Sequence, residues 1–242
     1  MTPELTHLLA QLKLRRVAEI LDDELAWAEE HSPSYGELLT RLLSQEHTAQ
    51  QDRFLEHRIR RARLPERWSL HTFPWDRQPG VARRVVEQLA TLDFIERGTN
   101  IVLIGPTGVG KTGIASGLLL KALYHGHRGL FMKAQDLFDE MYTTLADRST
   151  RKFLNRLIRL DLIVIDEMGY LNLRPEQSNM FFKLMEERYR LRKSTLITTN
   201  LEFPQWFEFL GKKSMVAALL DRLRHRCNTL IIDGPSLRQP EE

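Results

Sequence analysis

The sequence has 242 residues, of which 42% are hydrophobic and 28% charged, with a formal net charge of +3 at pH 7. This profile is typical of a soluble globular protein that is long enough for one α/β domain and a small additional region. A single cysteine, Cys227, excludes an internal disulfide and a multi-cysteine zinc site, and no apolar run approaches the roughly 20 residues of a membrane span.

The first 67 residues predict a helical domain. Apolar residues recur at helical spacing over residues 5–30, and Ser34 with Glu37 matches a capping box that would begin another helix. That helix is expected to continue into an arginine-rich stretch and to end at Pro65. We expect this domain, residues 1–67, to dock a partner protein or DNA.

Residues 68–80, which are rich in proline and aromatic side chains, predict a linker. From residue 81 to 242, helical patterns alternate with short apolar runs, which indicates βαβ units and a parallel sheet. The predicted strands are 101–104, 129–132, 162–165, 195–198 and 229–232, and the predicted helices are 85–92, 111–126, 135–146, 150–159 and 176–191. We therefore expect an α/β domain over residues 81–242.

Residues 105–112, directly after the first predicted strand, read Gly-Pro-Thr-Gly-Val-Gly-Lys-Thr, the P-loop spacing G-x-x-x-x-G-K-[ST]. Glycines let successive backbone N–H groups converge on phosphate oxygens, and the N-terminus of the following helix adds partial positive charge. Lys111 can reach the β- and γ-phosphates, and the hydroxyl of Thr112 can ligate Mg²⁺. The motif predicts a nucleoside triphosphate site made of Gly105, Pro106, Thr107, Gly108, Val109, Gly110, Lys111, Thr112 and Gly113.

Polar side chains also follow two later strands. Asp166 and Glu167 end the run Leu-Ile-Val-Ile, and the carboxyl edge of a parallel sheet is where such folds bind ligands. Asp166 is therefore placed to hold Mg²⁺ opposite Thr112, while Glu167 can orient and deprotonate the attacking water. Asn200 follows the next strand, where its amide can hydrogen-bond the water and the γ-phosphate; the alternative is a turn residue or a helix N-cap.

Arg222, Arg224 and Arg226 lie shortly before the last predicted strand. An arginine at such a place can reach the γ-phosphate of a neighbouring subunit as a finger, where it stabilises the charge of the transition state. The alternatives are a solvated basic turn and local pairing with Asp221. Position alone does not choose among the three arginines.

Together these motifs resemble the AAA+ ATPases and, within them, the IstB-like helper ATPases of insertion sequences, with DnaC-type helicase loaders as close relatives. The resemblance extends over about residues 5–235 and rests on the P-loop, the run LIVIDE, the tripeptide TTN and the box LLDRLRHR. It implies an α/β AAA+ core with a parallel sheet behind a small helical N-terminal domain, ATP hydrolysis, and ATP and Mg²⁺ as cofactors. It also implies that Asn200 is the sensor 1 residue and Arg222 the finger. No C-terminal lid is expected after Ile232, which leaves the adenine-side contacts unassigned.

Arginine and lysine cluster in residues 53–67, 148–159 and 188–193. The resemblance implies that 135–159 forms an extra helical element, which in initiators and loaders faces DNA. Arg148, Arg151, Lys152, Arg156 and Arg159 are the expected phosphate contacts, with Lys152, Arg156 and Arg159 on one side of a helix that begins near Thr150. We expect 188–193 to be a solvated face and 53–67 to be the second candidate for phosphate contact. DNA binding should be mostly independent of base sequence and sensitive to salt.

The resemblance implies a cytoplasmic ATPase that forms an ATP-dependent homo-oligomer on duplex DNA and recruits or activates a transposase, without a membrane partner. Hydrolysis would disassemble or reset that complex. The first alternative is a DnaC-like loader that acts on a replicative helicase and prefers single-stranded DNA. The second is a DNA-binding scaffold with negligible turnover, against which the intact Lys111, Asp166 and Glu167 argue.

Overall fold

The computed structural model describes residues 2–169, 171–211 and 213–238. These residues divide into two compact units, one extending to His57 and the other beginning at Arg58.

The N-terminal unit contains α1 (Pro3–Gln11), α2 (Arg15–His31) and the part of α3 (Tyr35–Arg61) up to His57. The helical spacing over residues 5–30 is interrupted between α1 and α2, where Lys13 has a positive φ of 59°. The predicted capping box is confirmed, because the Ser34 backbone N–H donates to the Glu37 carboxylate at 2.8 Å and the Glu37 N–H donates to the Ser34 hydroxyl at 3.3 Å. A small core joins the three helices and consists of Leu9, Val17, Ile20, Leu21 and Leu42.

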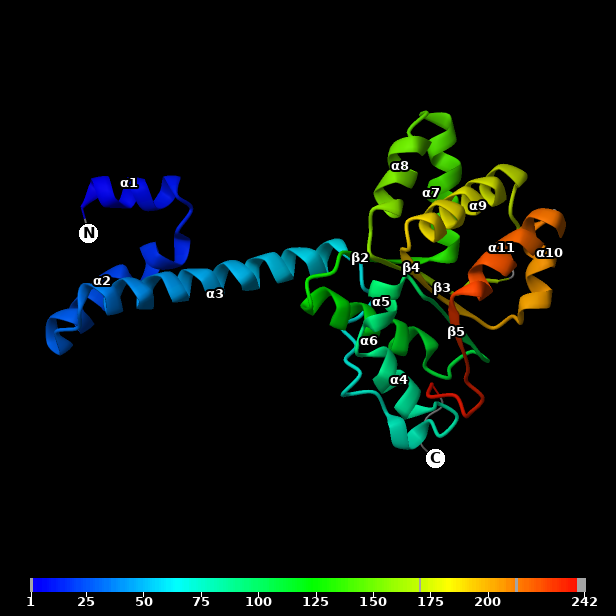
Figure 1. Ribbon diagram of the computed structural model, residues 1–242, viewed down its shortest axis with the longest axis horizontal. Coiled ribbons are helices and arrows are strands. Elements are labelled where there is room, and N and C mark those ends of the chain that lie inside the picture. The colour runs from blue at the N-terminus through cyan, green and yellow to red at the C-terminus, as the bar shows by residue number, and fades with distance from the viewer. Residues whose placement is uncertain (1, 170, 212, 239–242) are drawn as a thin grey trace. The chain divides into compact units, whose positions relative to one another are not determined.

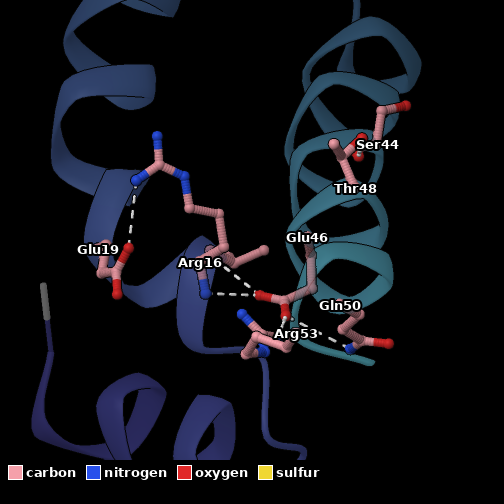
Figure 2. A network of polar contacts seen from close by, with 8 residues as sticks. Arg16, Glu19, Ser44, Glu46, Thr48, Gln50 and Arg53 are labelled. Atoms are coloured by element: carbon pink, nitrogen blue, oxygen red, sulfur yellow. Dashed lines mark hydrogen bonds and ion pairs between the residues drawn. The ribbon is translucent and has the colours of Figure 1, made fainter. Parts of the chain in front are cut away.

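A buried carboxylate on α3 caps the N-terminus of helix α2. Glu46 is only 2% exposed, and it accepts the backbone N–H groups of Arg16 at 2.6 Å and Val17 at 3.1 Å, as Figure 2 shows. The side chains of Gln50 and Arg53 donate to its other oxygen at 3.3 and 2.7 Å. Burial raises the pKa of Glu46, but these hydrogen bonds outweigh that effect and hold the pKa below its ordinary value. Since the local N-cap residue, Leu14, offers no side-chain acceptor, α2 obtains its cap from another helix.

Helix α3 ends at Arg61, earlier than the predicted end at Pro65. Arg63 has a left-handed φ of 54°, which a helix cannot continue through. Ala62 is fully buried, and its carbonyl accepts the backbone N–H of Phe131 at 2.7 Å. The helix therefore stops where the chain meets the sheet of the second unit.

The second unit is built on a parallel sheet, as predicted (Figure 1). Its strands are β1 (Asn100–Ile104), β2 (Gly129–Lys133), β3 (Leu162–Asp166), β4 (Ser194–Thr199) and β5 (Cys227–Ile231), in the spatial order β2-β3-β4-β1-β5. Strand β5 begins two residues before the predicted start at 229 and pairs with β1 along its whole length. Strands β3, β4 and β1 are neighbours in the sheet and run parallel, so their carboxyl ends lie at the same edge.

Helices cover both faces of this sheet. They are α4 (Arg83–Leu89), α5 (Asp93–Arg97), α6 (Lys111–Tyr124), α7 (Ala134–Ala146), α8 (Thr150–Ile158), α9 (Pro175–Arg190), α10 (Trp206–Leu210) and α11 (Lys213–His225), with short 3-10 turns at Trp75–Arg77 and Phe203–Gln205. Helices α7, α8 and α9 lie on one side of the sheet and α4 and α6 on the other (Figure 1). Val102 and Ile163 face the first layer and share its core with Phe138 and Phe181. The predicted helix 85–92 ends at Leu89, because Leu92 has a positive φ of 71°.

Arg188 corrects the expectation that residues 188–193 form a solvated face. Its side chain is 1% exposed, and the guanidinium donates to the carbonyls of Leu157 at 2.7 Å and Leu160 at 3.0 Å. It also donates to the carbonyl of Ser194 and to the hydroxyl of Thr195. Burial lowers the pKa of Arg188 to about 9, so the group stays charged at neutral pH. Arg188 thus ties the end of α8 to the start of β4.

Among the residues that the structure describes, no helix combines the length and apolar character that crossing a membrane requires.

Candidate nucleotide-binding site

The loop between β1 and α6 borders a cavity of about 560 Å³. Gly108 and Gly110 have φ values of 91° and 92°, a region that glycine enters without steric cost. Helix α6 begins at Lys111, as predicted, so its unpaired N–H groups lie at this end of the cavity. The loop and helix residues that line the cavity are Thr107, Gly108, Gly110, Lys111, Thr112 and Gly113. The strand, loop and helix thus have the arrangement that binds phosphate.

The ammonium group of Lys111 lies against the loop. Its Nζ donates to the carbonyls of Gly105 at 2.8 Å and Pro106 at 2.7 Å. Burial lowers the pKa of Lys111, while the nearby carboxylates of Asp166 and Glu167 oppose that shift. A partly desolvated cation between a glycine-rich loop and two acids is suited to hold phosphate oxygens.

Thr112 lines the cavity and contacts the buried carboxylate of Asp166 directly. The Thr112 hydroxyl lies 3.0 and 3.1 Å from the two carboxylate oxygens of Asp166. Asp166 is 2% exposed, and burial raises the pKa of its carboxyl, although hydrogen bonds from Thr198 and Thr112 oppose the rise. A hydroxyl and a carboxylate at this spacing are the oxygen donors that Mg²⁺ prefers, so the residues fit the predicted metal.

Glu167 has a strained backbone and a cationic neighbour. Its φ of 60° is left-handed, a conformation that non-glycine residues adopt at a cost and that is found often at functional sites. The carboxylate lies 3.6 Å from the Nζ of Lys133. Lys133 ends β2, and the register of β2 with β3 pairs it with Asp166. The sequence analysis did not identify Lys133, whose proximity depends on the strand order.

Thr198 is a second residue that the sequence analysis missed as a site residue, although it lies in the tripeptide TTN. Its hydroxyl donates to a carboxylate oxygen of Asp166 and accepts the backbone N–H of Glu167 at 2.9 Å. One side chain of β4 therefore positions both acids at the end of β3. The available signal was a strand that ends in hydroxyl residues at the ligand-binding edge of the sheet.

The cavity brings most of the predicted catalytic residues together. Asn200 lies just beyond β4 and lines the same cavity as Lys111 and Glu167. Their roles in catalysis stay predictions.

The three arginines near the end of α11 lie apart from this cavity. Arg222 is 3.6 Å from the carboxylate of Glu186 on α9 and lines a separate small cavity. Arg224 stacks over the ring of Phe203 at 5.5 Å, and Arg226 over Tyr189 at 4.8 Å. Arg222 does not line the cavity at the P-loop, and its finger role stays a prediction.

Helix α8 has the two-sided character that was predicted. Phe153, Leu154 and Leu157 are buried, whereas the five expected phosphate contacts, Arg148, Arg151, Lys152, Arg156 and Arg159, are exposed. Arg156 pairs with Glu140 of α7 at 2.9 Å, which reduces the charge it presents to solvent. DNA contact by these residues stays a prediction.

The chain is similar to known proteins in sequence and in fold. A family model described as "IstB-like ATP binding protein" matches residues 7–242. The chain is 37% identical to an insertion sequence IS21 putative ATP-binding protein of Pseudomonas aeruginosa, over 99% of this chain and 90% of that protein. It is 33% identical to the insertion sequence IS5376 putative ATP-binding protein of Geobacillus stearothermophilus, over 96% of this chain and 92% of that protein. The crystal structure of the DnaC helicase loader matches 68% of this chain and 96% of its own with a TM-score of 0.57 at 23% identity, a likeness of fold alone.

Proposed function

This chain belongs to the family of IstB-like ATP binding proteins, and from that premise we propose that it is a cytoplasmic, ATP-hydrolysing helper of insertion-sequence transposition. It binds ATP, self-associates on duplex DNA, and recruits or activates a transposase. The observation that carries the proposal is the cavity lined by Lys111, Thr112, Glu167 and Asn200. At this cavity the Thr112 hydroxyl lies 3.0 Å from the buried carboxylate of Asp166.

Each residue has a separate role in ATP hydrolysis. Thr112 and Asp166 would hold Mg²⁺, which would neutralise the charge that develops on the phosphate. When ATP binds, the ammonium group of Lys111 donates to phosphate oxygens in place of the loop carbonyls. Glu167 leaves Lys133 and accepts a proton from the attacking water at its carboxylate, and Asn200 orients that water.

Two variants separate binding from turnover. Lys111→Ala removes the charge that holds the phosphates, so it should abolish ATP binding. Glu167→Gln should bind ATP with near wild-type affinity and hydrolyse it at least about 100-fold more slowly, because only water activation is lost. Equal loss of nucleotide affinity in both variants, measured by calorimetric titration, would contradict these assignments.

The finger proposal requires a neighbour. Arg222→Ala should bind ATP and hydrolyse it up to about 10³-fold more slowly. When Arg222→Ala and Lys111→Ala proteins are mixed, some interfaces combine an intact P-loop with an intact Arg222, so part of the activity should return. If the mixture stays inactive although the two variants co-assemble, Arg222 does not act in trans, and Arg224 and Arg226 become the candidates.

DNA binding is proposed for the exposed face of α8. Lys152→Glu combined with Arg159→Glu should weaken binding to duplexes of any sequence and reduce the salt dependence of that binding, because fewer phosphates are neutralised. ATP binding should be unchanged. Arg84→Glu combined with Arg97→Glu is the matched control, because it changes the net charge equally at exposed positions on α4 and α5. Equal effects of both pairs would refute a specific role for α8.

Transposase recruitment is tested with the transposase of the same insertion sequence. Wild-type protein on duplex DNA with a non-hydrolysable ATP analogue should retain the transposase, and Lys111→Ala should not. We do not propose the helicase loader, since the likeness to the loader structure extends to the fold alone. Retention of a replicative helicase instead of the transposase would reverse this choice.

A further inference from the structure

The cavity at the P-loop extends beyond the phosphate end. Its lining also contains Pro65, Glu66, Trp68 and Phe73 from the segment before the sheet and Leu237 and Arg238 from the segment after β5. These two segments are far apart in sequence, and the sequence analysis assigned neither of them to the nucleotide. We refer to Trp68, Phe73 and Leu237 as the apolar wall.

The first segment lies on a glycine face of the P-loop and α6. An added Cβ at Gly110 would lie 2.8 Å from the ring of Phe73, and one at Gly117 would lie 2.7 Å from Leu70. At Gly113 it would lie 3.6 Å from the indole of Trp68. The spacing of these glycines places them on one side of the helix, so the aromatic segment packs directly along the first turns. The half-buried indole of Trp68 therefore lies beside the residue that follows the phosphate-binding Lys-Thr pair.

The second segment is anchored to the P-loop. The Leu237 backbone N–H donates to the carbonyl of Gly108 at 2.9 Å. Gln78 is buried, and its amide donates to the carbonyls of Val109 at 3.2 Å and Pro235 at 2.9 Å, which joins linker, loop and C-terminal segment. Leu237 and Arg238 are thus held at the cavity by hydrogen bonds to the loop that binds phosphate.

The ligand's orientation follows from the two ends of the cavity. Phosphates belong at Lys111, Thr112 and the N-terminus of α6, so the nucleoside must extend along the remaining wall. That wall is aromatic and aliphatic, as the face of a base requires, and Arg238 adds a cation whose charge contributes to the lowered pKa of Lys111. We propose that Trp68, Phe73 and Leu237 bind the nucleotide base and that Arg238 supplies a cation to its ribose-phosphate end.

This inference rests on the proposed ATP binding, and comparison of ATP with inorganic tripolyphosphate separates the two. A non-hydrolysable ATP analogue and tripolyphosphate are each titrated calorimetrically into wild-type protein with Mg²⁺. Base binding predicts at least about tenfold tighter binding of the analogue, since a base–aromatic stack contributes on that scale. If neither ligand binds, the proposed ATP binding itself is wrong. If both bind equally tightly, the apolar wall does not bind the base, and the assignment of the P-loop to phosphate is unaffected.

Variants then locate the contact. Trp68→Ala should weaken binding of the analogue about 5- to 100-fold and leave tripolyphosphate binding unchanged, while Trp68→Phe should retain most of the affinity. Trp27→Ala is the control, because Trp27 is also half-buried and stacks on another ring, that of His31 at 4.9 Å, without lining this cavity. Arg238→Ala should weaken binding of both ligands, and more at low salt. Unchanged analogue affinity in Trp68→Ala, or equal losses in Trp68→Ala and Trp27→Ala, would overturn the proposal.

Discussion

Thr198→Val tests the link between β4 and the two acids of the site. Valine has nearly the same shape as threonine, so the change removes the hydroxyl and little else. In the wild type this hydroxyl donates to Asp166 and accepts the Glu167 N–H at 2.9 Å. Its loss leaves the backbone N–H of Glu167 without its partner, and the Thr112 hydroxyl at 3.0 Å becomes the remaining donor to that oxygen of Asp166.

The magnitude follows from these two bonds. A hydrogen bond to a charged group contributes about 1.5–3 kcal/mol, and an unpaired buried N–H costs about 1–3 kcal/mol. Because valine itself needs no partner, we expect the free energy of unfolding to fall by about 2–4 kcal/mol. The pKa of Asp166, already raised by burial, should rise further. If half of the lost energy affects the transition state, kcat/KM should fall about 5- to 30-fold, with a higher Mg²⁺ requirement.

Thr199→Val is the matched control. Thr199 is also buried on β4, and its hydroxyl accepts the Leu201 N–H at 3.0 Å and donates to the carbonyl of Met168, so neither acid is involved. Urea denaturation and steady-state hydrolysis at varied Mg²⁺ would be measured for both variants. Both should lose stability, but only Thr198→Val should change the Mg²⁺ dependence. Equal kinetic losses in the two variants would refute the reasoning.

Lys133→Met frees the Glu167 carboxylate from a partly exposed ion pair, and steady-state hydrolysis should increase up to about fivefold; a decrease would show that the lysine assists turnover. Glu46→Gln should destabilise α2 by about 1 kcal/mol at pH 7, measured by amide hydrogen exchange, because the amide keeps an acceptor for the first N–H groups of α2 but loses the charge that pairs with Arg53 and with the helix N-terminus. Because folding lowers the pKa of Glu46, its stabilisation is present above the ordinary pKa of 4.5 and is lost as the pH falls through the folded value, so wild type and variant should converge in acid. Arg188→Met should reduce the free energy of unfolding by about 3–5 kcal/mol in urea, against less than about 0.5 kcal/mol for the exposed Arg190→Met; similar losses would contradict the buried network.

Elements with local signals could be predicted from the sequence. The apolar runs of β1 and β3 indicated strands covered on both faces, and both strands are buried along their whole length. The P-loop pattern gave the turn between β1 and α6, since only glycines fit its backbone, and α6 begins at Lys111 as expected. The acids after β3 and Asn200 after β4 were also found locally, because a parallel sheet places its carboxyl ends at one edge.

The tertiary structure alone decided the contacts between segments that are distant along the chain. Glu46 caps helix α2 by accepting the N–H of Arg16, which lies 30 residues earlier, and Arg188 is buried although it stands in a charged run. Thr198 reaches the acids of β3 only because β4 lies beside that strand. Periodicity reports which face of an element is apolar, but it does not report which element lies opposite. For the same reason the segment that carries Leu237 could not be assigned to the P-loop before the chain was folded.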